Sequence, residues 1–419
     1  MKVIYYSKPF FADCDFPLIK ALQDKGIDVH YYILLPQNFI RSSILEFNKP
    51  ISSKGFIKAS KMKDMEIYKD CIDLNRLFFI IGSPFKRSRI SSWLLWIYTL
   101  WHIKRQNADI IHIDWQFENN FEKYLFKFSL GRKKVMTIHD PIMHSGQPNA
   151  ISEEKNRLFS FSWAEHFVLL NTVQAEEFML KYSVPDRNIS YSILPLYNSI
   201  SYINPSPSTI EGDYVLFFGM IIPYKGLEYL LDAMLKVHKV HPNLKLVIAG
   251  GGQLYFDVSK YEGHDYIIWI HRYVGISELA GLLKKTKFVV CSYKDATQSG
   301  VIHTSFAMGV PVIASNVGAL AVDVKHGENG ILVPPCNVDA LADAIISLYY
   351  DKSFLQSLRQ NVISTNINDD RNLHIANDYI KLWDFEKGVF VSDVGTKNDY
   401  TYFINYWKHD SKNYIINAN

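Results

Sequence analysis

The sequence has few cysteines, and their spacing suits neither a disulfide framework nor a zinc site. The chain of 419 residues contains four, none of them in a CxxC pair: Cys14, Cys71, Cys291 and Cys336. Scattered cysteines of this kind are typical of reduced thiols inside cells. We therefore expect a cytoplasmic protein whose fold is held by packing rather than by crosslinks.

Long hydrophobic runs are also missing. The longest membrane-like stretch, 93–101, has nine residues, whereas a spanning helix needs about 20. The N-terminus begins MKVIYY without an apolar h-region, so we expect no secretory signal peptide. With 48% hydrophobic and 21% charged residues, the chain is predicted to be globular. Its length favours two domains, at about 100–200 residues each.

A large excess of one charge is absent, since the formal net charge is +3. Residues 1–200 carry 26 Lys and Arg against 20 Asp and Glu, and residues 201–419 carry 19 against 22. Domains that bind nucleic acid usually have a pI above about 9 with clustered basic residues. The composition thus argues against a nucleic-acid partner, and the basic first half favours an anionic surface or substrate there.

Short apolar runs alternate with amphipathic stretches, a pattern that predicts α/β architecture with parallel sheets covered on both faces. The strand-like runs of the first half are 2–6, 28–34, 109–113, 134–138, 166–169 and 189–193. Those of the second half are 213–219, 244–249, 265–270, 287–291, 310–314 and 330–333. We therefore predict two doubly wound, Rossmann-like domains. The stretch 37–84 has no regular pattern and receives no assignment.

The Pro- and Ser-rich segment 204–212 is the predicted linker. It separates a first domain, 1–203, from a second domain, 213–386. The second domain is predicted to end in helices at about 337–350, 352–363 and 370–386. The tail 387–419 has no period, and we expect it to pack back on the first domain.

Two loops of the second domain are candidates for ligand binding, because ligands of doubly wound sheets bind between strands 1 and 4 of the order 3-2-1-4-5-6. The loop GMIIPYKG (219–226) follows strand 1: Gly219 permits a tight turn, and Lys225 stands at the opening of the next helix. An anion at that position would also meet helix-terminal N–H groups. The alternative is a solvent-exposed lysine at the start of a helix.

The loop after strand 4 contains the small and polar residues Thr297, Gln298, Ser299 and Gly300 before the predicted helix 301–308. Gly300 lets backbone amides approach a ligand, and Ser299 or Thr297 can cap the helix. This pattern suits a diphosphate at the N-terminus of a helix, and simple capping is the alternative.

In the first domain, TIHDPIMHSG (137–146) places His139 and Asp140 at a strand end, with His144 in the same loop. A histidine beside an aspartate there can bond a sugar hydroxyl or move a proton. A histidine satisfied within its own loop is the alternative. Asp114, after the preceding strand, points to the same region.

A DxD pair, Asp13 and Asp15, follows the first strand. Such pairs bind metals in some transferases, but this half contains no evident nucleotide site, and we predict no metal. We interpret Asp15 as the N-cap of a helix 16–25 and Asp13 as an acceptor contact in the cleft.

The stretch 85–106 has basic ends and a tryptophan-rich middle. Its apolar residues lie nearly all round a helix, which favours burial. The alternative is a helix lying on an anionic bilayer.

Several segments together carry a recognisable signature. In the second half these are FFGMIIPYKGLEYLLDAM (217–234) and ATQSGVIHTSFAMGVPVIASNVGALAVDVKHGENGILVPP (296–335), and in the first half TIHDPIMHSG and DIIHIDW. With them the chain resembles retaining GT-B fold glycosyltransferases of the family-4 group, which includes bacterial exopolysaccharide and cell-surface glycan enzymes. The resemblance spans residues 1 to about 385.

The resemblance implies transfer of a hexosyl group from a nucleotide-diphosphate sugar, bound by the second domain, to a glycan or lipid-linked acceptor bound by the first. Lys225 matches the phosphate-binding lysine, and His139 matches the histidine that contacts the donor sugar. The remaining donor positions are Gly219, Arg272, Tyr273, Val274, Thr297, Gln298, Ser299, Gly300 and Val301. The acceptor positions are Asp13, Asp114, Asp140 and His144. No cofactor is implied.

The chain also departs from the family pattern. Many members carry two glutamates, seven residues apart, around the strand-4 loop, whereas this loop has none, and Thr304 or Ser305 stands at the ribose-binding position. An arginine upstream of the phosphate lysine is replaced by Met220 or Ile222. These departures leave the identity of the nucleotide open.

Three other functions remain as alternatives. A catalytically inactive sugar-nucleotide-binding module would share the same site, and a phosphorylase or epimerase would share the fold. An NAD-linked dehydrogenase would need a GxGxxG fingerprint, and the one that starts at Gly250 fails because Tyr255 occupies its last glycine position.

Overall fold

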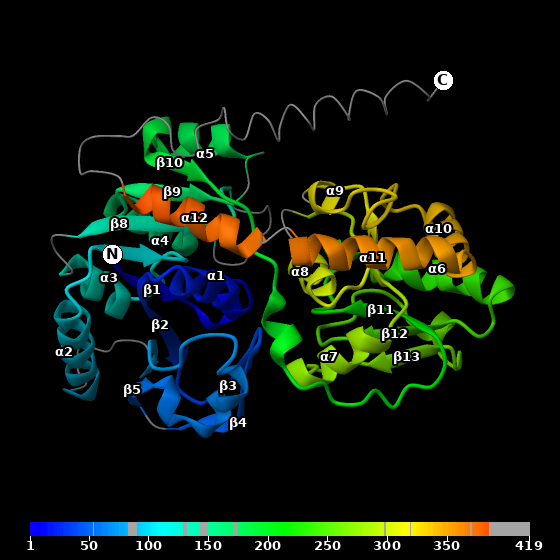
Figure 1. The fold of residues 1–419 in the computed structure, drawn as a ribbon, viewed down its shortest axis with the longest axis horizontal. Coiled ribbons are helices and arrows are strands. Elements are labelled where there is room, and N and C mark those ends of the chain that lie inside the picture. The colour runs from blue at the N-terminus through cyan, green and yellow to red at the C-terminus, as the bar shows by residue number, and fades with distance from the viewer. Residues whose placement is uncertain are drawn as a thin grey trace.

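The computed structural model describes residues 1–52, 54–82, 90–128, 132–142, 150–170, 172, 174–296, 299–318, 320–368 and 371–384. They form two α/β lobes that lie side by side (Figure 1). Three predicted site residues, His144, Thr297 and Gln298, lie outside these ranges, as does the tail 387–419.

The first lobe contains an eight-stranded sheet in the order β10-β9-β8-β7-β1-β2-β6-β5, parallel except for the edge strand β5. Its strands are β1 (Lys2–Ser7), β2 (Asp28–Pro36), β5 (Gly55–Lys58), β6 (Leu77–Gly82), β7 (Ile110–Ile113), β8 (Lys133–Ile138), β9 (His166–Leu169) and β10 (Ile189–Tyr191). Its helices are α1 (Ala12–Asp24), α2 (Ile90–Arg105), α3 (Asn120–Lys127), α4 (Ala150–Trp163) and α5 (Ala175–Tyr182). The central strands are buried on both faces, which explains their continuous apolar sequence.

The second lobe contains a six-stranded parallel sheet in the order β13-β12-β11-β14-β15-β16, which confirms the predicted 3-2-1-4-5-6 arrangement. Its strands are β11 (Tyr214–Phe218), β12 (Lys245–Ala249), β13 (Ile267–Ile270), β14 (Val289–Cys291), β15 (Val312–Ser315) and β16 (Gly330–Val333). Its helices are α6 (Leu227–Val240), α7 (Ile276–Lys285), α8 (Gly300–Ala307), α9 (Leu320–Asp323), α10 (Val338–Tyr350) and α11 (Lys352–Asn368). The crevice between β11 and β14 therefore opens where ligand binding is expected.

The unassigned stretch 37–84 contains an antiparallel hairpin of β3 (Phe39–Ser42) and β4 (Leu45–Ile51), followed by β5, two short 3₁₀ turns and β6. The hairpin is not part of the main sheet. Its tip, Ser43–Ile44, has Ser43 at φ +53°, a conformation that is uncommon outside glycine and asparagine.

The last helix, α12 (Arg371–Trp383), lies on the first lobe against α1 (Figure 1). Trp383 is 1% exposed, and its indole N–H donates to Nδ1 of His112 at 3.0 Å. Lys133 also donates to the Trp383 carbonyl. This position differs from the sequence-based division, which placed a helix 370–386 in the second domain, because an amphipathic pattern does not say which surface its apolar face covers.

Helix α2 is not buried, contrary to the favoured interpretation of the stretch 85–106. Leu94, Ile97 and Trp101 are 62%, 53% and 49% exposed, and Ile90 and Tyr98 are also open to solvent. Only one side of the helix packs against the rest of the lobe. The apolar residues on its other side are not covered by the described part of the chain. None of the helices in the described part of the chain combines the length and apolar character needed to cross a membrane.

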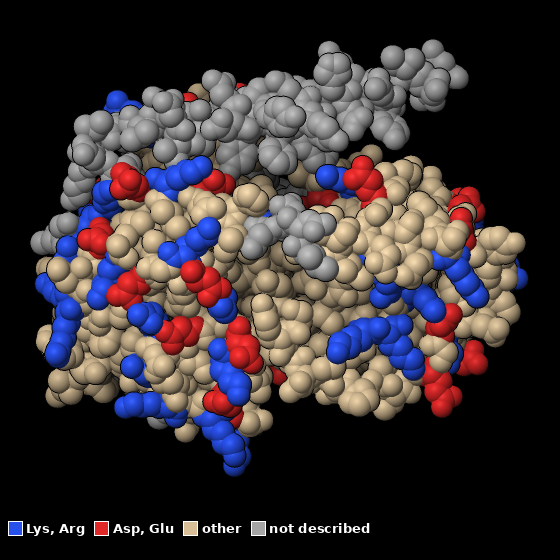
Figure 2. Space-filling view, viewed as in Figure 1, with Lys and Arg blue, Asp and Glu red and all other residues tan. Residues whose placement is uncertain are grey.

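The charged side chains are intermixed. On the face shown in Figure 2, basic and acidic groups alternate over both lobes without a stripe of one sign. This distribution agrees with the small net charge.

Candidate functional site

A cavity of about 560 Å³ lies between the lobes, at the carboxyl ends of β11 and β12. The second lobe contributes the loop after β11, the glycines after β12 and the start of α8. The first lobe contributes Asp13, the hairpin tip, and Tyr197 and Ser199 from the segment that leads to the second lobe. The two predicted ligand loops therefore meet at one cavity.

Lys225 lies at one end of this cavity, at the close of a 3₁₀ turn (Pro223–Lys225), and is only 8% exposed. Its ammonium faces the ring of Tyr293 at 5.6 Å. Within the described part of the chain, no carboxylate forms an ion pair with it. Burial lowers the pKa of Lys225 to about 8. A buried ammonium without a carboxylate partner is costly, and an anionic ligand would relieve that cost.

Two glycines keep the space around Lys225 open. Gly219 has φ +98°, and a Cβ there would lie 2.9 Å from Nζ of Lys225. A Cβ on Gly250 would lie 1.9 Å from the carbonyl oxygen of Gly219. The glycines after β12, expected only to form a tight turn, therefore let that loop approach the loop after β11 closely.

The N-terminus of α8 faces the same cavity, with Gly300 and Val301 in its lining. Ser299 is the N-cap residue, but its side chain makes no capping bond, and its buried hydroxyl has no hydrogen-bond partner among the described residues. Amides of a first helical turn lack intrahelical partners and can bind an anion. Gly300 has a second role, because a Cβ there would lie 2.7 Å from the Tyr197 ring.

The segment after β13, two strands away from β11 in the sheet, lines the same cavity. Tyr273 and Val274, two of the residues predicted at the base position, are in its lining. Arg272, the third, is not: its guanidinium bonds both carboxylate oxygens of Glu278, at 2.8 and 2.7 Å, and it borders a smaller cavity beside the linker. Of the two candidates for the ribose position, Thr304 lines the main cavity and Ser305 is buried.

A second cavity, of about 270 Å³, adjoins the first on the side of the first lobe. His139, Asp13 and Asp140 line it together with Phe10 and Phe11. The His139 ring stacks on Phe11 at 3.9 Å and 13°. Three of the predicted first-domain residues are therefore brought together beside the large cavity.

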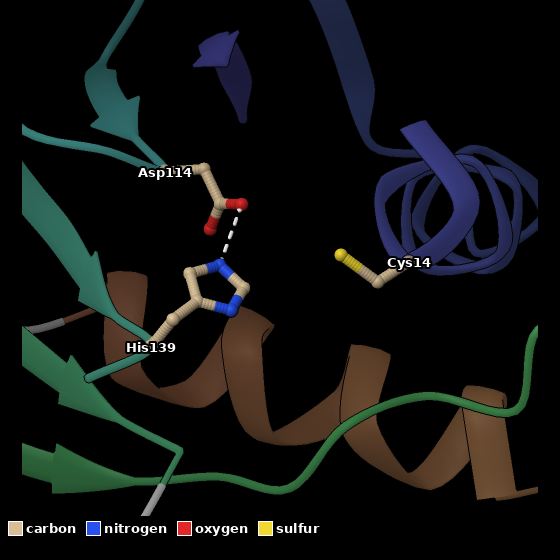
Figure 3. Close-up of side chains that lie close together, drawn as sticks. All are labelled: Cys14, Asp114 and His139. Atoms are coloured by element: carbon tan, nitrogen blue, oxygen red, sulfur yellow. Dashed lines mark hydrogen bonds and ion pairs between the residues drawn. The ribbon is translucent and has the colours of Figure 1, made fainter. Parts of the chain in front are cut away.

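Asp114 contacts His139 directly (Figure 3) and is not among the residues that line the two cavities. Nε2 of His139 is 2.9 Å from Oδ2 of Asp114, and both residues are buried. Burial disfavours the imidazolium, but the Asp114 carboxylate outweighs that effect and raises the pKa of His139. Burial would raise the pKa of Asp114, and the neighbouring His139 charge instead lowers it. Each partner therefore favours the charged form of the other.

The two aspartates of the DxD pair have different surroundings. Asp15 is not an N-cap, because α1 begins at Ala12 and includes it. Its carboxyl accepts from Tyr31 at 2.6 Å and from Tyr5 at 3.3 Å, and burial together with the Asp114 charge raises its pKa well above the usual value. Asp13 lines both cavities, and burial raises its pKa to about 6.

One cluster in the described residues has metal-ligand types close together: atoms of Cys14, Asp114 and His139 lie within 4.8 Å of one another (Figure 3). Burial raises the pKa of the Cys14 thiol well above its usual value. Metal binding needs the thiolate, and the His139 nitrogen nearest Asp114 is already bonded to that carboxylate. These residues therefore fit a metal ion poorly.

Sequence reasoning missed several residues of the site, including Phe11, Tyr197 and the hairpin tip. Phe11 stands two residues before Asp13, and the aromatic pair Phe10–Phe11 was the only sign in the sequence that it stacks on a ring. The hairpin lay in the unassigned stretch. None of these positions carries a charge or a motif that would have marked it.

Residues 212–351 match the family model described as Glycosyl transferases group 1. An uncharacterized glycosyltransferase of Methanocaldococcus jannaschii is 27% identical over 269 residues, which cover 62% of this chain and 70% of that protein. The alpha-D-kanosaminyltransferase of Streptomyces kanamyceticus is 24% identical over 314 residues, covering 69% and 79%.

Among solved structures, HepE of Anabaena in complex with UDP-glucose is similar, with a TM-score of 0.60 at 14% identity, covering 91% of this chain and 100% of that one. The architecture is the GT-B fold of two Rossmann-like domains, as predicted. Together with the family match to the second lobe, these similarities support a glycosyltransferase of GT-B fold.

Proposed function

We propose that the protein is a retaining glycosyltransferase that moves a hexosyl group from a nucleotide-diphosphate sugar to a glycan or a lipid-linked oligosaccharide in cell-surface polysaccharide synthesis. The observation that carries this proposal is Lys225, a buried ammonium without a carboxylate partner in the described chain, in a cavity that the start of α8 also lines. An amine and free helix amides suit a diphosphate.

In the proposed reaction, cleavage of the anomeric bond leaves negative charge on the diphosphate. Lys225 and the amides at the start of α8 would stabilise this charge without a metal ion. One donor of this kind contributes about 10²–10³ in rate. Because Lys225 is largely buried, its attraction for the leaving group is stronger than it would be in water.

The second cavity is the proposed acceptor site, with Asp13 and Asp140 as contacts. His139, oriented by Asp114, would bond the transferred sugar at the boundary between the two cavities. The large cavity has one carboxylate in its described lining, Asp13, which comes from the acceptor side. We therefore propose front-face attack by the acceptor hydroxyl, with its proton passing to the departing phosphate oxygen. This route retains the anomeric configuration without a covalent intermediate.

We also propose that the protein works at the cytoplasmic face of a membrane, with α2 as its contact. The exposed side of α2 presents Leu94, Ile97 and Trp101, and its last turn carries Lys104 and Arg105. Helices with an apolar aromatic face and basic ends bind anionic bilayers at the headgroup level. Such a position would bring a lipid-linked acceptor to the first lobe.

The test is a thermal-shift screen against UDP-, GDP- and ADP-sugars, followed by NMR assignment of the anomeric centre in the product. A ligand at 100 times its Kd should stabilise the protein by about 2.7 kcal/mol. An inverted product would contradict retention. Binding without transfer or hydrolysis for any donor would favour the alternative, an inactive sugar-nucleotide-binding module, for which the non-acidic Thr304 at the ribose position is the supporting observation.

A further inference from the structure

The β3–β4 hairpin of the first lobe reaches the base-position loop of the second lobe. The hydroxyl of Tyr273 donates to the carbonyl oxygen of Ser43 at 2.9 Å, and the guanidinium carbon of Arg41 lies 4.3 Å from the centre of the Tyr273 ring. The backbone amide of Ile276 donates to Oε1 of Glu46 at 2.8 Å. A surface hairpin therefore makes three different polar contacts with the other lobe.

Glu46 caps the N-terminus of helix α7 in the second lobe. Helix α7 begins at Ile276, and its N-cap is Gly275, which has no side chain to accept the first amides. Glu46 supplies that acceptor from the other lobe, and its negative charge also favours the N-terminal end of the helix dipole. The Gly275 position leaves room for it, since a Cβ there would lie 3.1 Å from Oε1 of Glu46.

The hairpin tip also lines the large cavity. Ser43 and Ile44 share its wall with Tyr273 and Val274, whereas Lys225 and the start of α8 line another part of the same cavity. Ser43 is held there at φ +53°, and its hydroxyl accepts from the Asp13 amide at 3.2 Å. A ligand with its diphosphate at Lys225 would thus extend its nucleoside toward the hairpin.

We propose that the hairpin is an interdomain clasp that completes the nucleoside end of the donor site, with Arg41 and Glu46 as positioning residues. The inference rests on the proposed function, because it requires a nucleoside diphosphate in the cavity. Arg41 and the Ser43 carbonyl fix the Tyr273 side chain, and Glu46 fixes the start of α7. The nucleoside would then be held by residues of both lobes, and the diphosphate mainly by residues of the second.

The experiment compares two probes on the full chain, UDP (or GDP or ADP, whichever binds) and inorganic pyrophosphate, by calorimetric and ³¹P NMR titration. The clasp variants are Arg41→Gln, Glu46→Gln and Tyr273→Phe. The matched controls are Arg132→Gln and Glu66→Gln, which change the same residue types at exposed positions of the first lobe. Melting curves without ligand verify that each variant is folded, and Tyr273→Phe retains the ring if a charge variant fails to fold.

We expect Arg41→Gln and Glu46→Gln to bind the nucleoside diphosphate about tenfold more weakly, as loss of a charge-assisted contact of about 1.4 kcal/mol would give. Tyr273→Phe should weaken binding by a smaller factor, about fivefold, because it loses a neutral hydrogen bond of about 1 kcal/mol. Pyrophosphate affinity should change less than about twofold, and the controls should match the wild type. Equal weakening of both probes, or no weakening, overturns the inference and leaves the proposed function intact. Failure of the wild-type chain to bind any nucleotide overturns both.

Discussion

Lys225 is buried, faces an aromatic ring and has a lowered pKa. A bound anion would stabilise its charged form. We expect Lys225→Ala to lower turnover at least about tenfold, because it removes one charged donor from the leaving group. Initial rates with saturating donor, together with an unchanged or higher melting temperature, would test this. Full activity of the variant would remove Lys225 from the mechanism.

The same lysine predicts how nucleotide binding depends on pH. In the free protein Lys225 loses its proton around pH 8, and a bound diphosphate raises that pKa toward its usual value of 10.5. Binding above pH 8 must therefore take up a proton, and affinity should fall by up to about tenfold per pH unit. Calorimetry from pH 7 to 10 in two buffers measures both effects. Lys225→Gln should bind weakly with a flat profile in this range.

In the absence of nucleotide, the lowered pKa of Lys225 should make the folded protein more stable as the pH rises. The unfolded chain binds the Lys225 proton up to about pH 10.5, whereas the folded chain releases it near pH 8. Stability attributable to this residue therefore rises with pH through that window. In Lys225→Gln, this contribution should be missing from a plot of melting temperature against pH.

Two buried carboxyls, Asp114 and Asp15, should respond differently to the same substitution. The His139 charge lowers the pKa of Asp114, whereas burial and the Asp114 charge raise the pKa of Asp15. Asp114→Asn should remove the main cause of the raised His139 pKa and lower turnover at least about tenfold. Asp15→Asn leaves the His139–Asp114 contact in place and should retain most activity.

The pH–rate profile separates these two effects. In Asp114→Asn, the His139 titration should move to lower pH, and in Asp15→Asn it should stay within about half a unit. NMR titration of the His139 ring provides a direct readout. Equal losses in both variants would contradict the different roles given to Asp114 and Asp15.

The sequence predicted the charged part of the site better than its shape. Lys225, Gly219, Ser299, Gly300 and Val301 all belong to loops whose glycines and helix starts are visible in the sequence. Asp114 was identified as a polar residue near the cleft and Asp15 as an N-cap, but the burial of these two residues was not predicted, since it depends on how the strands and α1 pack. Arg272 was predicted to bind the donor because it follows a strand of the second domain. In the structure its guanidinium bonds Glu278, and the residue does not line the large cavity.

At the scale of single elements, the sequence misjudged the environment of α2 as well as that of α12. Helix periodicity shows which residues share a face of the helix, but it does not show what that face contacts. An apolar face that binds a bilayer has the same sequence pattern as one that packs in a core. The stretch 37–84 was missed for a different reason. Its hairpin strands and β5 pair antiparallel, so they lack the continuous apolar signal of the parallel strands. The apolar run of β6 does carry that signal and pairs parallel with β2, but it stands among these irregular segments and was not assigned.

The double variant Leu94→Gln/Ile97→Gln should weaken binding to vesicles at least about tenfold, because it removes two large apolar side chains from the exposed face of α2. Sedimentation with vesicles of equal parts phosphatidylglycerol and phosphatidylcholine measures the bound fraction. Leu180→Gln is the control, since Leu180 is 83% exposed on α5 of the same lobe. Equal binding of all three proteins, or binding to pure phosphatidylcholine alone, would contradict the proposed membrane face.

At the scale of the whole molecule, the two lobes are tied together by α12 as well as by the linker. Trp383→Ala should destabilise the protein by about 3–5 kcal/mol, the usual cost of removing a large buried aromatic. The control is Trp101→Ala, the same substitution at a residue that is 49% exposed, which should change stability by less than about 0.5 kcal/mol. Urea unfolding of both variants compares them, and equal stability would show that α12 does not hold the first lobe.

The return of α12 to the first lobe also dictates how this protein could be divided or recombined. A single cut at the linker would give an amino-terminal fragment that lacks the helix covering α1 and His112. The carboxy-terminal fragment would carry that helix with its apolar face exposed to solvent. A working hybrid with a related enzyme needs two junctions, one in 204–212 and one between α11 and α12. The terminal helix must then be taken from the parent that supplies the amino-terminal half.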